Sequence, residues 1–317
     1  MPSQYQETPV RLSPDLAAIR CCPVCHGSLA EQTRELRCVS CDQRFAVTDR
    51  GQADLRLPAA RNAVQLPDTR FSVSASLVAE ARAALTERVA PAVPHNRYSG
   101  PIPTHLTREQ VAHIPEARRR TLALDLGCGS GLHRPVLEGL GYTYYGLDYE
   151  GDGAMDLADA HALPCRNNSF DLALSIAVLE HLRDPTRAMQ ELHRVLKPGA
   201  LFIGTAAFME PFHDNSYFHF SYLGVYTVLV TAGFIVERIC PIPRWNVVRA
   251  HLRMGFGGHV PDLATRAVAA AFDGAVGLHR RVASLRGRSS RDNSKAAAAA
   301  RHAGAFFFVA SKPNSRR

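Results

Sequence analysis

The chain has 317 residues, of which 46% are hydrophobic, so it can bury a sizeable core in one large or two modest domains and is not disordered throughout. The formal charge of +8 fits an anionic partner, and it equally fits an arginine-rich soluble surface. Residues 1–18 are polar and lack a signal-peptide core. The longest apolar stretch, 222–236, is too short and broken for a membrane span. We therefore expect a cytoplasmic protein without a transmembrane segment.

Four of the eight cysteines form two Cys-x-x-Cys pairs, Cys22 with Cys25 and Cys38 with Cys41. Thiols stay reduced in the cytoplasm, so paired cysteines favour a metal over disulfides. This spacing predicts one tetrahedral structural Zn²⁺ site. Residues 1–58 have too little core to fold alone, so metal binding would supply the folding energy.

The segment from Cys21 to Pro58, with its Asp54-Leu55 step, resembles the zinc-ribbon family that includes small activator subunits of methyltransferases. That resemblance leaves the role of the module open, because zinc ribbons bind RNA, bind proteins or brace a neighbouring domain. Residues 59–120 are rich in arginine, alanine and proline and predict a linker or helical cap, with one helix over 75–89.

From Thr121 onward, apolar runs with strand character alternate with helical patterns, which is typical of an α/β fold. The run Leu122–Leu126 breaks into alternating glycines, and the next run ends at Asp148. Such a turn lets the backbone approach a nucleotide, and the acid is placed to accept hydrogen bonds from ribose hydroxyls. We expect strands at 122–126, 143–147, 155–158, 170–176, 201–205 and 234–239, and helices at 132–140, 184–196, 222–231, 262–285 and 294–303.

Six motifs follow in order: Leu-Asp-Leu-Gly-Cys-Gly-Ser-Gly, Gly-Leu-Asp, Ala-Asp-Ala-His-Ala-Leu-Pro, Ser-Phe-Asp-Leu, Val-Leu-Glu-His and Leu-Lys-Pro-Gly. Together they resemble class I S-adenosylmethionine-dependent methyltransferases of the type 11-like subset, which act largely on small molecules. NAD-dependent dehydrogenases share the glycine turn, but the block 159–164 and the Glu180-His181 pair disfavour them.

The resemblance implies a Rossmann-like, doubly wound, seven-stranded sheet over 121–317, preceded by the zinc ribbon. Ala305–Ala310 matches the last, antiparallel strand, which makes 241–304 a helical insertion before that strand. We expect the insertion to form a lid or a homodimer surface. The inward face of its long helix would consist of Leu263, Ala267, Val268, Ala271, Phe272, Val276 and Val282.

The resemblance also implies a site for S-adenosylmethionine. Gly127, Gly129 and Gly131 would lie along its methionine end, and Asp125 would reach its ammonium group through water. Asp148 would hold the ribose. Asp159 and the Ala160 amide would hold the adenine edge, and Ile176 would line the pocket. The connection between Asp148 and Asp159 is too short for the usual helix, which thins one wall of the adenine pocket.

The candidate general bases are His181, His213 and His219, which follow the fourth and fifth strands. The loop 211–222 is dense in aromatic and imidazole groups, so it either binds the acceptor or is a structural loop. Three functions fit these features: methyl transfer to a small molecule such as a glycan, lipid or secondary-metabolite intermediate, methylation of rRNA or tRNA gripped by the ribbon, and a non-catalytic zinc-ribbon scaffold.

Overall fold

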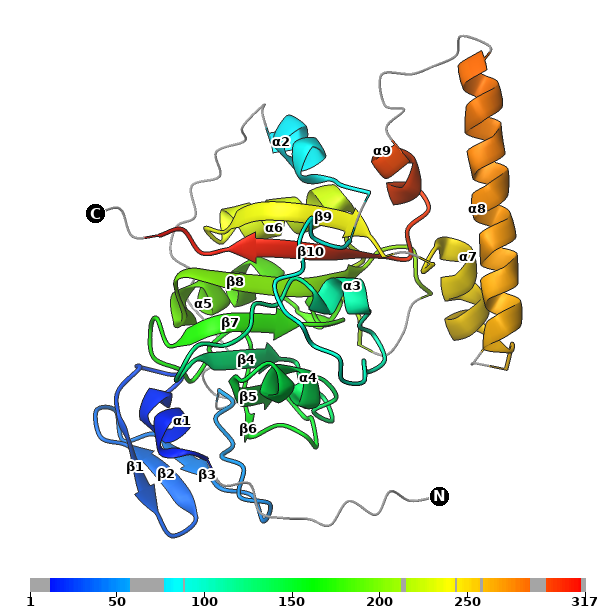
Figure 1. Cartoon of the computed structure of the whole chain (residues 1–317). Helices are drawn as coiled ribbons and strands as arrows, with labels where there is room; N and C mark the ends of the chain where they lie inside the picture. Colours follow the sequence, from blue (N-terminus) through cyan, green and yellow to red (C-terminus); the bar gives the residue numbers. More distant parts are fainter. Residues whose placement is uncertain are drawn as a thin grey trace.

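The computed structural model describes residues 12–57, 77–87, 89–211, 215–242, 244–256, 259–285 and 295–314 (Figure 1). Among these residues, no helix combines the length and the apolar character that crossing a membrane requires. The predicted linker, 59–120, falls partly outside the described residues, and the domain limits at 58 and 120 stay predictions. Helix α2, Leu77–Ala84, ends before the expected limit at Val89, and residues 75 and 76 lie outside the described residues.

The N-terminal module is a three-stranded antiparallel ribbon preceded by helix α1, Pro14–Ile19. Its strands are β1 (Leu29–Gln32), β2 (Glu35–Cys38) and β3 (Arg44–Ala46). Its apolar core consists of six buried residues, Cys22, Leu36, Cys38, Phe45, Ala53 and Leu55. A core of this size contributes little folding energy, which agrees with a module that depends on metal.

The main body is a seven-stranded sheet of order β6-β5-β4-β7-β8-β10-β9. The strands are β4 (Leu122–Leu126), β5 (Thr143–Asp148), β6 (Asp156–Leu157), β7 (Phe170–Ser175), β8 (Leu196–Ala207), β9 (Ile235–Pro241) and β10 (Ala305–Ser311). Strand β10 pairs antiparallel with both β8 and β9, whereas β4, β5, β6, β7 and β8 pair in parallel. The predicted fold class is confirmed, including the antiparallel last strand.

The helices of the main body match their predicted bounds to different degrees. Helix α5, Pro185–Val195, begins after Asp184, whose side chain accepts a hydrogen bond from the Arg187 amide and caps the helix. Helix α4, Arg134–Gly139, is shorter than the expected 132–140, and α6, Tyr222–Thr231, has the expected bounds. The short helices α3 (Arg108–Val111) and η2 (Leu179–His181) complete this part. Helix α2 packs against α6 and β9, and α6 also packs against α5.

The edge of the sheet at β6 is where the zinc ribbon joins the main body (Figure 1). No helix lies between β5 and β6, as the short connection predicted. The Leu55 amide donates to the Leu157 carbonyl at 2.8 Å, and the Leu157 amide donates to the Ala53 carbonyl at 2.9 Å. The backbone of Ala53–Leu55 thus continues the sheet in parallel beside β6 and satisfies groups that an edge strand leaves unpaired.

The insertion before β10 comprises α7 (Val247–Ala250), a π-helical turn η3 (His251–Gly255), α8 (Asp262–Leu285) and α9 (Lys295–Ala300). Helix α8 has the expected bounds, but the expected inward face is wrong. Its buried residues are Thr265 and Ala269, while Leu263 is 81% exposed. Helix α8 packs against α7 and η3 and runs along the side of the molecule (Figure 1), so most of its apolar stripe meets no partner within the described chain. A homodimer through this segment stays a prediction.

Candidate active site

A cavity of about 540 Å³ opens where the carboxyl ends of β4, β5, β6 and β7 meet. Parallel strands place the residues that follow them at one edge of a sheet, which is where ligands bind in open α/β folds. The residues that line this cavity are Leu126, Gly127, Leu147, Asp148, Tyr149, Glu150, Ala158, Asp159, Ala160, His161, Ala177, Val178, His181, Leu182, Arg183, Asn215 and Tyr217.

The glycines after β4 give the loop its shape. Gly127 has φ +73°, and a Cβ atom there would lie 2.3 Å from a methyl carbon of Val178. Gly129 has φ +54°, and no atom lies within 4 Å of the position where its Cβ would stand. A side chain is therefore excluded at Gly127 by the protein itself, whereas the space beside Gly129 is open.

The amide groups of these glycines already have partners within the protein. The Gly127 amide donates to the Leu147 carbonyl at 2.8 Å, and the Gly129 amide donates to Oδ2 of Asp148 at 2.7 Å. The Gly131 amide donates to the carbonyl of Cys128 at 2.8 Å. The glycines therefore contribute space and backbone conformation, and their amides hold the loop together. Of the three, Gly127 lines the cavity.

Asp125 lies beneath the glycine loop and is fully buried. Its Oδ2 accepts a hydrogen bond from the Tyr144 hydroxyl at 3.1 Å and lies 3.5 Å from Nδ1 of His133. Within the described part of the chain, its Oδ1 has no hydrogen-bond partner. A buried acceptor without a donor is unfavourable unless a ligand or water supplies one. The ammonium group of S-adenosylmethionine is a donor of the kind that this atom lacks.

Asp148 lines the cavity and ties two loops together. Its Oδ2 accepts from the Gly129 amide, and its Oδ1 accepts from the Glu150 and Gly151 amides at 3.1 and 3.2 Å. A carboxylate offers about four lone-pair sites, so three amide donors leave it able to accept one more hydrogen bond. A ribose hydroxyl in the cavity could provide that bond.

Asp159 and Ala160 line the cavity just after β6. The Asp159 carboxylate accepts two hydrogen bonds from His161, one from the ring nitrogen Nδ1 at 2.6 Å and one from the backbone amide of His161 at 2.9 Å. Burial opposes ionisation, but these hydrogen bonds outweigh it and hold the pKa of Asp159 below its usual value. The Asp184 amide donates to Nε2 of His161 at 3.1 Å, so the hydrogen-bond network assigns the ring proton to Nδ1.

The remaining predicted site residues lie in different places. Ile176 is buried in the core, and the cavity is lined instead by the next two residues, Ala177 and Val178. His181 lines the cavity. His219 is exposed and lies outside the cavity lining, and His213 lies outside the described residues.

The sequence reading did not single out two residues of the cavity wall, Tyr149 and His161. Tyr149 directly follows Asp148 at the end of β5, and this position after a parallel strand was a signal for it. His161 lies in the Ala-Asp-Ala-His motif, but its contact with Asp184 arises only in the folded chain.

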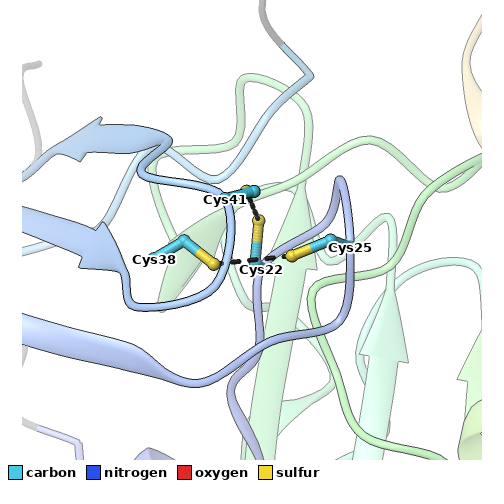
Figure 2. A group of neighbouring side chains, drawn as sticks. All are labelled: Cys22, Cys25, Cys38 and Cys41. Carbon is cyan, nitrogen blue, oxygen red and sulfur yellow. Dashed lines mark hydrogen bonds between the residues drawn. The ribbon is translucent and has the colours of Figure 1, made fainter.

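The four paired cysteines converge in the ribbon (Figure 2). Their sulfur atoms all lie within 4.8 Å of one another, with 3.7 Å between those of Cys22 and Cys41 and 3.5 Å between those of Cys25 and Cys38. Tetrahedral Zn–S bonds of about 2.3 Å place sulfurs roughly 3.8 Å apart, so the donor set fits Zn²⁺. The neighbouring Cys21 is not part of this group.

One family model matches part of the main body. Residues 124–204 match the family model described as a methyltransferase domain. Over this segment the chain is similar to methyltransferase domains. The matched segment begins in β4, at the glycine loop, and ends in β8, so it includes most of the cavity wall.

Several curated proteins are similar to this chain over about 100 residues. The human mitochondrial arginine-hydroxylase NDUFAF5 is 34% identical over 30% of this chain and 31% of its own length. The ubiquinone biosynthesis O-methyltransferase of Ruegeria pomeroyi is 32% identical over 25% of this chain and 38% of its own length. The 2-phytyl-1,4-naphtoquinone methyltransferase of Nostoc punctiforme is 34% identical over 29% of this chain and 49% of its own length. The chain thus spans between 31% and 49% of the length of these relatives.

Solved structures give more distant likenesses. A chain from the complex of the Haloferax volcanii Trm112 methyltransferase activator with its methyltransferase partner is 20% identical, with a TM-score of 0.44 over 66% of this chain and 90% of its own. The phosphoethanolamine N-methyltransferase 2 of Haemonchus contortus, solved with S-adenosyl-L-methionine, is 18% identical, with a TM-score of 0.39 over 63% of this chain and 50% of its own.

Proposed function

We propose that this protein transfers a methyl group from S-adenosylmethionine to a small-molecule acceptor. The observation behind the proposal is the cofactor cavity at the glycine loop, with the Asp148 carboxylate in its wall and the unpaired Oδ1 of Asp125 buried beneath the loop. The match of residues 124–204 to the methyltransferase domain supports it. A volume of about 540 Å³ lies within the usual range for small-molecule sites.

The residues around the cavity would bind and orient the cofactor. Asp125, which does not itself line the cavity, would accept a hydrogen bond from its ammonium group through water, and Asp148 would accept one from its ribose. Asp159, already held by His161, would stand with the Ala160 amide at the adenine edge. The bound cofactor supplies an electrophilic methyl group on a sulfonium, and the protein's contribution is alignment for in-line displacement.

The acceptor would enter beside His181 and Tyr217, which both line the cavity. The Tyr217 and Phe218 amides donate to the Glu180 carbonyl at 2.7 and 3.1 Å, which holds the loop after β8 against η2. Transfer of the methyl group to a hydroxyl acceptor would require that the hydroxyl lose its proton. The described cavity wall contains two histidines, His161 and His181, and His181, which the sequence already indicated as a base, could take this proton.

A small-molecule acceptor fits two of the relatives, which are named for methylation in ubiquinone synthesis and of a phytyl-naphthoquinone, whereas another is named an arginine-hydroxylase. The zinc ribbon leaves room for RNA as acceptor. However, the ribbon arginines Arg44 and Arg56 pair with Glu35 and Asp54, so their charges are already partly neutralised. We also propose that the four clustered cysteines hold one structural Zn²⁺.

Two measurements test the function. Calorimetry of the zinc-loaded full chain with S-adenosylhomocysteine should give saturable binding to one site, and Asp148→Ala should weaken this binding at least ~10-fold because a charge-assisted hydrogen bond is lost. Asp152→Ala, an exposed acid on the same loop, is the control. When the protein is incubated with host extract and methyl-labelled cofactor, the label should appear in the small-molecule fraction. Label in RNA would refute the acceptor class, and no binding at millimolar ligand would refute the enzyme.

A further inference from the structure

The wall of the cofactor cavity formed by Tyr149 is shared with the zinc ribbon. Tyr149 lines the cofactor cavity, and it also lines a second, shallower cavity of about 450 Å³ on the ribbon side, together with Arg44, Phe45, Asp54 and Arg56. Tyr149 is 53% exposed and contributes to the lining of both spaces. A large aromatic ring this exposed needs a contact to keep one orientation, because its χ1 rotamers otherwise interconvert.

Arg56 of the ribbon provides that contact. Its guanidinium carbon lies 5.2 Å from the centre of the Tyr149 ring, which is within the range of a cation–π interaction. Nη1 of Arg56 also donates to the Tyr149 carbonyl at 3.3 Å. The same side chain therefore contacts both the ring and the backbone of Tyr149.

Arg56 is itself held in place. Its Nε and Nη2 donate to the two carboxylate oxygens of Asp54 at 2.8 and 2.7 Å, which is the bidentate geometry that fixes a guanidinium plane. Asp54 lies in the segment that pairs with Leu157 of β6, so the position of Arg56 follows from the sheet edge. A second ion pair, Arg50 with Asp152, joins the ribbon to the same loop but is largely exposed.

We propose that Arg56 is a positioning residue of the cofactor cavity, which holds the Tyr149 ring as a stacking surface for the purine of an adenosyl ligand. The zinc ribbon would then support this wall of the cavity, where no helix lies between β5 and β6. Aromatic side chains stack readily on purines because every base has a π-face. The proposal rests on the proposed function, since it requires that an adenosyl ligand occupies the cavity.

The test measures S-adenosylhomocysteine affinity by calorimetry on zinc-loaded full-length variants. Arg56→Met removes the charge and the hydrogen bonds, and we expect a roughly 3- to 10-fold loss of affinity. Arg56→Lys keeps a cation over the ring and should recover part of it. Tyr149→Phe keeps the ring face and should bind like the wild type. Arg44→Met is the matched control, because Arg44 lines the same second cavity but pairs with Glu35, and it should leave affinity unchanged.

A double-mutant cycle separates positioning from a general structural role. In a Tyr149→Ala background, Arg56→Met should have almost no further effect on affinity, because its action passes through the ring. Equal affinity of Arg56→Met and the wild type would overturn the proposal, and so would an undiminished effect of Arg56→Met in the Tyr149→Ala background. If the Arg56→Met variant loses zinc or thermal stability, the proposal is judged on the S-adenosylhomocysteine affinities of the Arg56→Lys and Tyr149→Phe variants instead. Absence of binding by the wild-type chain would instead refute the proposed function.

Discussion

Two additions flank the central sheet, and they attach to it in different ways. The zinc ribbon joins the β6 edge by backbone hydrogen bonds between Ala53–Leu55 and Leu157. The α7–α9 insertion leads into β10, but its long helix α8 buries only Thr265 and Ala269. The ribbon is therefore continuous with the sheet, whereas most of α8 lies against solvent.

A buried ion pair strengthens the first attachment. Asp156 of β6 is fully buried and accepts hydrogen bonds from the Arg20 side chain, from the Tyr145 hydroxyl and from the Ala53 amide at 3.0 Å. Arg20 and Ala53 belong to the ribbon module, and Tyr145 belongs to the main sheet. A buried carboxylate is tolerated only when donors surround it, so the two parts depend on each other for this group. We infer that changes in the ribbon are transmitted to the cofactor cavity, and that changes in α8 are not.

The largest expected effect is at the metal. Cys25→Ser removes a ligand whose side chain is exposed, so the consequence comes from the metal rather than from packing. Mutation of a residue that merely holds a metal ligand typically lowers metal affinity roughly 10- to 100-fold, and loss of the ligand itself should lower zinc affinity more. The ribbon should also become sensitive to protease. Zinc content by atomic absorption and limited proteolysis check this. His26→Asn is the control, because His26 has φ +58° and asparagine tolerates that conformation. One equivalent of zinc retained by Cys25→Ser would contradict the four-cysteine site.

The next effect is at the ion pair. Asp156→Ala leaves Arg20 without its partner in a largely buried position, and we expect the free energy of unfolding to fall by about 3–5 kcal/mol. Thermal or denaturant unfolding measures this. Asp152→Ala, at a side chain that is 85% exposed on the same edge, should cost less than about 1 kcal/mol. Similar losses for the two variants would show that the ribbon attachment depends little on this pair.

A smaller effect should follow pH. The hydrogen bond from Arg56, opposed by burial, holds the pKa of Asp54 below its ordinary value of 3.8. Because the folded pKa is lowered, the stabilisation is present above about pH 4 and is lost as the pH falls through the folded value. Asp54 is about one-third exposed, so we expect less than about 1 kcal/mol. The difference in Tm between wild type and Asp54→Asn should narrow from pH 6 to pH 3, and a constant difference would argue against this ion pair.

The smallest effect should be on α8. Leu278→Ser and Leu285→Ser change side chains that are 63% and 87% exposed, so we expect changes within about 0.5 kcal/mol in stability and none in S-adenosylhomocysteine affinity. Ala269→Asp, at a buried position, is the destabilising control. Loss of a dimer in light scattering, or a Tm that depends on protein concentration, would show that α8 has a partner in solution and would remove the contrast with the ribbon.

Local patterns predicted the order of the main elements from β4 onward, but the bounds of only some of them. Strand β4 and helices α6 and α8 have the predicted bounds, because each combines an apolar pattern with a clear stop or cap. The cysteine spacing also predicted a convergent site, since each Cys-x-x-Cys pair places two sulfurs locally. The pattern of α8 did not reveal its surroundings. Amphipathic periodicity records which face could be buried, and only the packing of other elements determines whether it is.

The sequence by itself determined the α/β order, the glycine loop with Asp148 at the next strand end, and the four-cysteine cluster, because these depend on residues close together in the chain. Tertiary structure alone decided that the ribbon extends the β6 edge, that Asp156 meets Arg20 across 136 positions, and that Arg56 lies over Tyr149. Such contacts depend on how distant segments pair, and no local periodicity records that pairing.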